Sequence, residues 1–167
     1  MSAQYDVPTY LLDKENIRDT VIRMMFAFDQ GATLVLVNRV YTPEIILDYD
    51  TLLIGKGIEN IASSEWAKRL ETMHDHFDTT QHIVQNLLVE LPQPGSAPRP
   101  ARCTVFAYAH GWFYKRDGEG WPRTLGKRNG ANYELELVRS DDEKAKGGNP
   151  WRITRQKVRL DFQDLGA

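Results

Sequence analysis

The sequence predicts an α+β domain in which a strongly bent, mixed and mostly antiparallel sheet forms a cone-shaped barrel around N-terminal helices. Two helical stripes of apolar residues lie in the first half of the chain, and four segments of strand character fill the second half. Loops rich in Pro, Gly or charge separate these strands. The chain has 167 residues, 41% of them hydrophobic, which fits a single domain over residues 1–167. The open end of such a cone is a natural pocket for a small molecule.

Composition and charge argue against several classes of function. Lys plus Arg (21) against Asp plus Glu (23) leaves a net charge of -2, too little positive field to hold nucleic acid. The N-terminus lacks the basic and apolar regions of a secretory signal, and the single cysteine, Cys103, cannot form an internal disulfide. No segment approaches the roughly 20 apolar residues that cross a bilayer. We therefore expect a soluble, cytoplasmic protein that binds neither nucleic acid nor membranes.

The first long helix is expected after an N-terminal arm that comprises residues 1–12. Asp13 can cap a helix that begins near Lys14 and that ends at Gly31. Its apolar residues recur at spacings of four, three and four, the period of a helix with one buried stripe. They are Ile17, Val21, Met24 and Phe28. The next apolar run, residues 33–41, is either a short helix or a buried strand, and we favour a helix.

A strand and a second helix are expected next. The alternation of Ile45, Leu47 and Tyr49 predicts a strand with one apolar face. After a turn that contains two glycines, Ser63 or Ser64 can cap a helix. Its apolar stripe repeats the spacing of the first helix and consists of Trp66, Leu70, Met73 and Phe77.

Four strands are expected in the second half of the chain, at residues 80–91, 101–115, 129–139 and 151–162. In the last of them the apolar positions change parity between Ile153 and Val158. One extra residue in the strand explains such a change. We predict a β-bulge between Thr154 and Lys157.

The sequence contains none of the strong signatures of nucleotide or nucleophilic-serine chemistry, such as G-x-x-x-x-G-K-[ST], G-x-G-x-x-G or G-x-S-x-G. Cys103 lies in an apolar strand, where a small buried hydrophobe is the more common role. His74 and His76 stand two residues apart near a helix end, so they do not share a face, and we interpret them as solvent-facing. We expect no metal site and no cofactor.

His82 and Asp29 are polar residues at positions where the pattern is apolar. His82 is in phase with Val84 and Leu88 of its strand, and Asp29 lies four residues beyond Met25 on the inner flank of its helix. If Asp29 accepts a hydrogen bond from one ring nitrogen of His82, the other nitrogen becomes a general base. The alternative is two unrelated polar residues at the ends of their elements.

Tyrosines are the candidate acids. Tyr49 shares a strand face with apolar residues, and Tyr133 alternates in phase with two leucines, so both phenols can reach the interior. Buried phenols that only pack and make one hydrogen bond are the alternative. Tyr108 and His110 alternate with small residues at 107, 109 and 111. If that small face lines the pocket, the pocket is roomy.

The ordered segments of the chain resemble the SnoaL-like family, and within it the scytalone dehydratase branch of the nuclear transport factor 2-like superfamily. They are LLDKENIRDTVIRMMFAFDQG, LDYDTL, FDTTQHIVQNLLVEL, ARCTVFAYAHGWFY, NYELELVR and PWRITRQKV. The resemblance covers residues 11–162. It implies the cone fold and the removal of water from a hydroxyketone without a cofactor.

The resemblance also implies roles for particular residues. It places Asp29 and His82 at the family's dyad positions and Tyr49 at one of two tyrosine positions. The second tyrosine position is Phe28 here. The family's second histidine falls at His110 or Gly111, and the strand phase favours Gly111.

The family's next strand carries a Ser and an Asn, which align with Ala131 and Tyr133. These departures leave the base in place but change the acids and enlarge the cavity.

We therefore expect a dehydratase-like, cofactor-independent lyase or isomerase that acts on a polycyclic or aromatic hydroxyketone, such as a polyketide, in secondary metabolism. His82, Asp29 and Tyr49 are the expected catalytic residues. The expected substrate contacts are Tyr133, His110, Phe28, Tyr108, Arg39 and Phe162. The alternatives are a cyclase or rearrangement catalyst that steers a reactive intermediate, and a non-catalytic ligand-binding module.

Oligomerisation is the last expectation. Cone-fold relatives use the outer face of the sheet as an interface, and Trp112 and Tyr114 point outward in the predicted strand. We expect a homo-oligomer of two or three copies.

Overall fold

The computed structural model describes residues 5–55, 57–140 and 148–166. Its helical elements are α1 (Val7–Asp29), α2 (Thr33–Val35), the π-helical turn η1 (Leu36–Val40), α3 (Thr51–Ile54), α4 (Ser63–Glu71) and α5 (Met73–His76). Its strands are β1 (Tyr41–Tyr49), β2 (Ile58–Ala62), β3 (Thr79–Glu90), β4 (Arg102–Lys115), β5 (Thr124–Arg139) and β6 (Trp151–Leu165).

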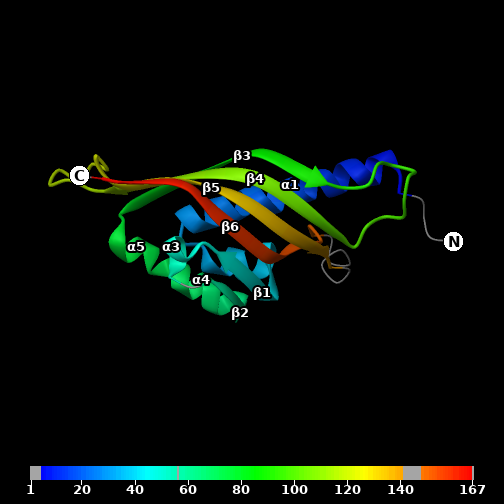
Figure 1. Cartoon of the computed structure of the whole chain (residues 1–167), viewed down its shortest axis with the longest axis horizontal. Coiled ribbons are helices and arrows are strands. Elements are labelled where there is room, and N and C mark those ends of the chain that lie inside the picture. The colour runs from blue at the N-terminus through cyan, green and yellow to red at the C-terminus, as the bar shows by residue number, and fades with distance from the viewer. Residues whose placement is uncertain (1–4, 56, 141–147, 167) are drawn as a thin grey trace.

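The strands form one six-stranded sheet in the order β2-β1-β6-β5-β4-β3. β1 and β6 run parallel, and the other neighbouring pairs are antiparallel. Figure 1 shows the sheet curling lengthwise over the helices, with α1 behind β3 and β4, with α4 beside β1 and β2, and with α5 next to α4. The predicted fold class, a bent and mixed sheet wrapped around helices, is confirmed. The sheet is curled but open, because β2 and β3 are its two edges.

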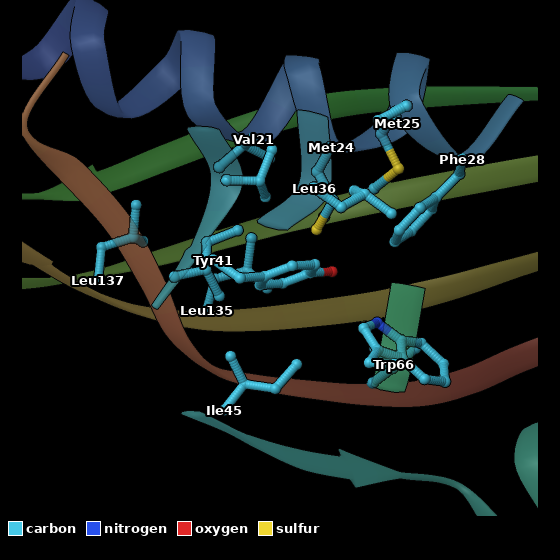
Figure 2. Close-up of a cluster of buried hydrophobic side chains, with 14 of the residues drawn as sticks. Val21, Met24, Met25, Phe28, Leu36, Tyr41, Ile45, Trp66, Leu135 and Leu137 are labelled. Carbon is cyan, nitrogen blue, oxygen red and sulfur yellow. The ribbon is translucent and has the colours of Figure 1, made fainter. Parts of the chain in front are cut away.

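The core fills the concave side of this sheet. The predicted helical stripe of α1 is buried over its whole length, from Ile17 to Phe28. Figure 2 shows Phe28 of α1, Tyr41 of β1, Trp66 of α4 and Leu135 of β5 gathered in one cluster. Apolar contact between the helix stripe and the inner sheet face thus fixes how α1 lies across β3.

The first helix begins earlier than predicted. α1 starts at Val7, where Asp6 caps it by accepting a hydrogen bond from the backbone N–H of Thr9 at 2.9 Å. Residues 7–12 therefore belong to the helix and not to an arm. Pro8 lies in the first turn, where a missing N–H costs nothing. Asp13, predicted as the cap, is fully buried inside the helix and pairs with Arg99.

The region after β1 contains elements that the pattern did not predict. α3 and β2 occupy the stretch predicted as a glycine turn. The second helix is divided into α4 and α5, and no side chain caps α4, since its N-cap is Ala62 and Ser63 is buried. The favoured helix over residues 33–41 is present as α2 and η1, before β1 begins at Tyr41.

The later strands follow the prediction with longer ends. β5 begins at Thr124, five residues before the predicted start, and β6 continues to Leu165. The register between β5 and β6 shifts between Ile153 and Arg155, so the extra residue is Thr154, at the first position of the predicted interval. A second shift, at Asp161, was not predicted. Within the described ranges, no helix is at once long and apolar enough to span a membrane.

Candidate active site

A cavity of about 120 Å³, open to solvent on one side, lies between the end of α1, α4 and the inner faces of β4 and β5. Most of its wall is apolar and includes Phe28, Trp66 and Phe113. The polar residues in the wall are His82, Tyr49, Tyr133, Lys127 and Asn129. A cavity of comparable size, about 150 Å³, holds one benzene molecule in another protein. The enclosed space is therefore about the size of a single ring, and a larger molecule would extend through the open side.

Asp29 and His82 meet at the edge of this cavity. The Nδ1 atom of His82 lies 2.7 Å from Oδ1 of Asp29, and the backbone N–H of His82 donates to Oδ2 at 2.8 Å. Thr80 donates its hydroxyl to Oδ1 at 2.9 Å. The side chains are 10% exposed for His82 and 17% for Asp29, so both are largely withdrawn from water. A carboxylate with these donors keeps one orientation and fixes the imidazole beside it.

The ends of two elements bring this pair together. α1 ends at Asp29, and Gly31 at φ 59 turns the chain in the left-handed region that glycine adopts readily. His82 is the fourth residue of β3, which packs along α1. His74 of α5 adds a contact, since its Nε2 lies 3.0 Å from the backbone oxygen of Phe28. His74 is therefore partly buried against the helix end, and the prediction that it faces solvent is wrong.

The hydrogen bond from Nδ1 decides which nitrogen of His82 is free. A neutral imidazole carries a proton on only one of its two nitrogens. Because Nδ1 of His82 donates a hydrogen bond to Asp29, that proton is on Nδ1. Nε2 is then an acceptor on the far side of the ring, which lines the cavity. The rings of Phe28 and Phe113 stand edge-on to the imidazole at 5.9 and 5.3 Å between centroids. The imidazole is thus held on several sides with one nitrogen available to a bound molecule.

Tyr49 presents a phenol to the same cavity. Its oxygen accepts a hydrogen bond from Nε2 of Gln156 at 2.7 Å, and Oε1 of Gln156 accepts from the hydroxyl of Tyr41 at 2.6 Å. Because the Tyr49 oxygen is already an acceptor, its own O–H is left to donate. Burial and the nearby Tyr133 hold the pKa of Tyr49 well above its usual value. Tyr49 is therefore a neutral hydrogen-bond donor at neutral pH.

Tyr133 also lines the cavity, from β5. Burial raises the pKa of its phenol, so it too stays neutral. Of the residues expected at the site, Asp29, His82, Tyr49, Tyr133 and Phe28 lie together around the cavity.

His110 and Tyr108 lie on the opposite face of the sheet. On β4 the odd positions Ala109, Gly111 and Phe113 face the cavity, and the even positions therefore face outward. His110 contacts Phe162 there at 5.7 Å between ring centroids. Gly111 pairs with His82, so the favoured glycine, and not His110, stands where the family's second histidine would be.

Phe162 and Arg39 also lie away from the cavity. The unpredicted shift at Asp161 places Phe162 opposite Gly130, on the outer face, whereas Val158 still faces inward. η1 buries Leu36 and Val40, which turns Arg39 outward to solvent. These four residues, His110, Tyr108, Phe162 and Arg39, are therefore wrong as contacts for a molecule in the cavity.

The site also contains residues that the sequence pattern did not single out. Lys127 and Asn129 lie on the inner face of β5, in the same alternation as Ala131 and Tyr133. Extending that alternation backward would have found Lys127, which lies before the predicted start of the strand at 129, whereas Asn129 was inside the predicted strand and was not singled out. Gln156 is fully buried between two phenols. Its neighbours in the sequence, Arg155 and Lys157, are charged, so the sequence pattern did not indicate a buried position.

Other polar candidates can be placed as well. Cys103 is buried, and burial raises the pKa of its thiol to about 12, so it stays protonated, as expected for a packing residue. In the described part of the chain, no three His, Cys, Asp or Glu side chains gather in a way that could hold a metal ion.

Solved structures share this fold. A protein described provisionally as a scytalone dehydratase from Novosphingobium aromaticivorans matches with a TM-score of 0.69 at 13% identity, over 94% of this chain and 89% of its own. The hexachlorocyclohexane dehydrochlorinase LinA-type3 from Novosphingobium barchaimii matches with a TM-score of 0.67 at 14% identity, over 93% and 91%. A nuclear transport factor 2-like superfamily protein from Salmonella enterica matches with a TM-score of 0.63 at 13% identity, over 91% and 92%. At these identities the likeness establishes the fold.

The curled sheet around α1 and the cavity at its open end thus define a protein of the nuclear transport factor 2-like fold. The family model of the SnoaL-like domain matches residues 9–157, and this chain belongs to the SnoaL-like domain family. No curated protein matches the sequence.

Proposed function

We propose that this protein is a cofactor-independent lyase or isomerase that removes a proton next to the carbonyl of a ring-bearing hydroxyketone, in the manner of a dehydratase. The observation that carries the proposal is the Asp29–His82 pair at 2.7 Å on the edge of a mostly apolar cavity. Solved structures of the same fold include a dehydrochlorinase and a protein described as a dehydratase, whose names denote eliminations. Secondary metabolism remains the proposed setting.

The first step is proton abstraction. Nε2 of His82 takes a proton from the carbon next to the carbonyl, and the electron pair of the C–H bond moves to the carbonyl oxygen, which gives an enolate. Asp29 stabilises the imidazolium that forms and keeps its ring in place. The three hydrogen bonds that Asp29 accepts from Thr80 and His82 hold it in that position.

The second step is the loss of the leaving group. The enolate electrons return to form a carbon–carbon double bond, and the hydroxyl on the next carbon leaves with the proton that His82 carries, as water. Tyr49 donates a hydrogen bond to the enolate oxygen. Because its pKa is raised by burial, Tyr49 acts as a neutral donor and not as the source of the proton.

The cavity sets the size of the substrate. At about 120 Å³ it takes one six-membered ring, and the remainder of a larger molecule would extend through the open side. We therefore propose a monocyclic hydroxyketone, or a larger one that inserts a single ring.

The test uses 3-hydroxycyclohexanone as the probe. The protein should convert it to cyclohexenone, measured by the ultraviolet absorption of the enone, and should exchange the protons next to the carbonyl in deuterated water, measured by NMR. His82→Ala should reduce both rates by at least about 100-fold, since general base catalysis contributes about 10²- to 10⁴-fold. His76→Ala, in the exposed last turn of α5, is the control and should keep the wild-type rates. Undiminished exchange in a folded His82→Ala protein contradicts the proposal.

Asp29→Asn separates this proposal from a cyclase whose cavity only steers an intermediate. A dyad loses rate when the carboxylate is replaced, whereas a cavity that only orients its guest tolerates the amide. We expect Asp29→Asn to lower the exchange rate by about 10²-fold or more. A rate within about twofold of wild type would instead favour the cyclase.

A further inference from the structure

Lys127 places a positive charge in the cavity that already holds His82. On β5 the inner positions 127, 129, 131 and 133 line the cavity in turn. Lys127 pairs in register with Phe113 of β4, whose ring also contacts His82. The ammonium and the imidazole therefore stand beside the same phenyl ring.

The surroundings of this ammonium are aromatic and not acidic. Its Nζ lies 4.5 Å from the ring centroid of Phe113 and 5.7 Å from that of Phe77. Among the described residues no carboxylate pairs with Lys127, whereas Lys157 and Arg128 each contact one at 2.7 Å. Burial lowers the pKa of Lys127. The charge is thus partly removed from water without a counter-ion.

A charge in this position costs free energy that the two rings offset only in part. A cation–π contact stabilises an ammonium less than a paired carboxylate does. A partly desolvated ammonium without an anion is therefore unfavourable. A ligand that brings one negative charge removes this cost. The free side of the ammonium is the cavity, where the other polar groups are His82, Asn129 and two neutral phenols.

We propose that Lys127 binds a carboxylate of the substrate, so that the site takes a single-ring hydroxyketone acid. This inference rests on the proposed function and names the class of its substrate. One ammonium matches the single charge of a carboxylate, whereas a phosphate, with nearly two charges and more acceptor oxygens, needs more donors. The carboxylate would anchor the ring at β5 with its carbonyl side toward Tyr49 and His82.

The binding of two small rings tests this directly. Benzoate and benzamide have nearly the same shape and differ in charge, and isothermal titration calorimetry gives the affinity of each. Wild type should bind benzoate about 10- to 100-fold more tightly than benzamide, as expected for a charge-assisted hydrogen bond. Lys127→Met should abolish this preference and Lys127→Arg should retain it. Lys115→Met, at an exposed position of β4, is the matched control and should behave as wild type.

Two results overturn the inference. One is equal or undetectable binding of benzoate and benzamide by wild type, and the other is a preference for benzoate that survives in Lys127→Met. Circular dichroism establishes that each variant is folded, and Lys127→Gln replaces the Met variant if that one is not.

The same measurement on His82→Ala keeps this inference separate from the proposed function. If His82→Ala binds benzoate as wild type does, the anion site stands on its own, whatever the turnover assay shows. If turnover depends on His82 while benzoate shows no preference, only the carboxylate proposal fails.

Discussion

Among single residues, Lys127 is one whose charge we expect to favour the binding of an anionic ligand and to lower the stability of the ligand-free protein. Its folded-state pKa is lowered by burial, so the folded protein binds fewer protons than the unfolded chain at pH values between that lowered pKa and 10.5. Stability therefore rises with pH through this window. At pH values below this window Lys127 is charged in both states, and the whole cost of burying its charge is subtracted from the free energy of unfolding.

We predict that Lys127→Met is more stable than wild type at pH 7, by about 1 kcal/mol, or roughly 2–4 °C in melting temperature. The advantage should shrink as pH rises toward 10.5, because wild-type Lys127 then loses its charge. Thermal unfolding followed by circular dichroism at several pH values measures this. A Met variant that is less stable than wild type at pH 7 would show that the ammonium is satisfied in the empty cavity.

Gln156 is a second residue whose role is visible only in the structure. It is fully buried, accepts from Tyr41 and donates to Tyr49, and both phenols are held by it. We predict that Gln156→Leu lowers the free energy of unfolding by about 2–4 kcal/mol, because buried polar groups lose their partners. Urea unfolding measures the loss, and Gln163→Leu, on the exposed end of β6, should change stability by less than about 0.5 kcal/mol. A loss of equal size in both variants would argue against this role.

At the scale of elements, α1 is joined to the loop before β4 through a buried ion pair. Asp13 is fully buried and accepts from Nε and Nη2 of Arg99 at 2.9 and 2.7 Å, and from the indole of Trp151 at 2.9 Å. These contacts connect the helix with the β3–β4 connection and with the start of β6, which lie at the same end of the sheet. Removing the cation leaves the buried carboxylate without its counter-ion.

We predict that Arg99→Ala lowers the free energy of unfolding by about 3–5 kcal/mol, the range for breaking one side of a buried pair. Arg18→Ala is the matched control, since Arg18 is a partly exposed residue of α1 that lies 3.8 Å from Glu15, and it should cost at most about 0.5 kcal/mol. Guanidinium chloride unfolding compares the two. A loss for Arg99→Ala no larger than for Arg18→Ala contradicts the prediction.

The same elements show what the sequence could and could not predict. Long, regular patterns were informative: the apolar stripe of α1 and the alternation on β1 and β4 identify which residues face inward, including Tyr49. The pairing of Asp29 with His82 followed from their phases and from the family resemblance. Phe162 was misplaced because one unpaired residue, Asp161, reverses the inward face of β6, and hydropathy carries no trace of that shift.

Short elements and charged inner residues were missed for related reasons. β2 is only five residues long and lies at a sheet edge with little burial, so it leaves no alternating pattern. Lys127 is charged, and a charged residue next to a predicted loop is usually assigned to solvent. Asp13 carried a cap signal, but the capping residue is Asp6, about two helical turns earlier along the chain.

At the scale of the whole molecule, the outer face of the sheet carries a row of apolar side chains. Ile83, Phe106, Tyr108 and Phe162 are each more than a third exposed there, next to His110 and Trp112. The ring of Phe162 lies so close to Gly130 that a Cβ at position 130 would be 2.3 Å from it, so this ring packs directly on the backbone of β5. We propose that a second copy of this chain covers the row.

We predict two or three copies per particle in size-exclusion chromatography with light scattering. Tyr108→Asp should shift the protein to the monomer, because a charge at the centre of an apolar interface is not neutralised. Ile58→Asp, on exposed β2 at the opposite edge of the sheet, should leave the oligomer unchanged. A monomeric wild-type protein would exclude this assembly.

The parallel neighbour of β1 is β6, which follows β5 and is the last strand among the described residues. β6 lies between β1 and β5, and it also supplies Gln156 and Val158 behind the cavity. Before β6 leaves the ribosome, a growing polypeptide can pair β3, β4 and β5 with one another. It cannot yet join them to β1, because β6 is the strand that pairs with both β1 and β5. The Asp29–His82 pair can therefore assemble before the Tyr49 phenol is secured by Gln156, so binding competence should be acquired only after β6 has been synthesised.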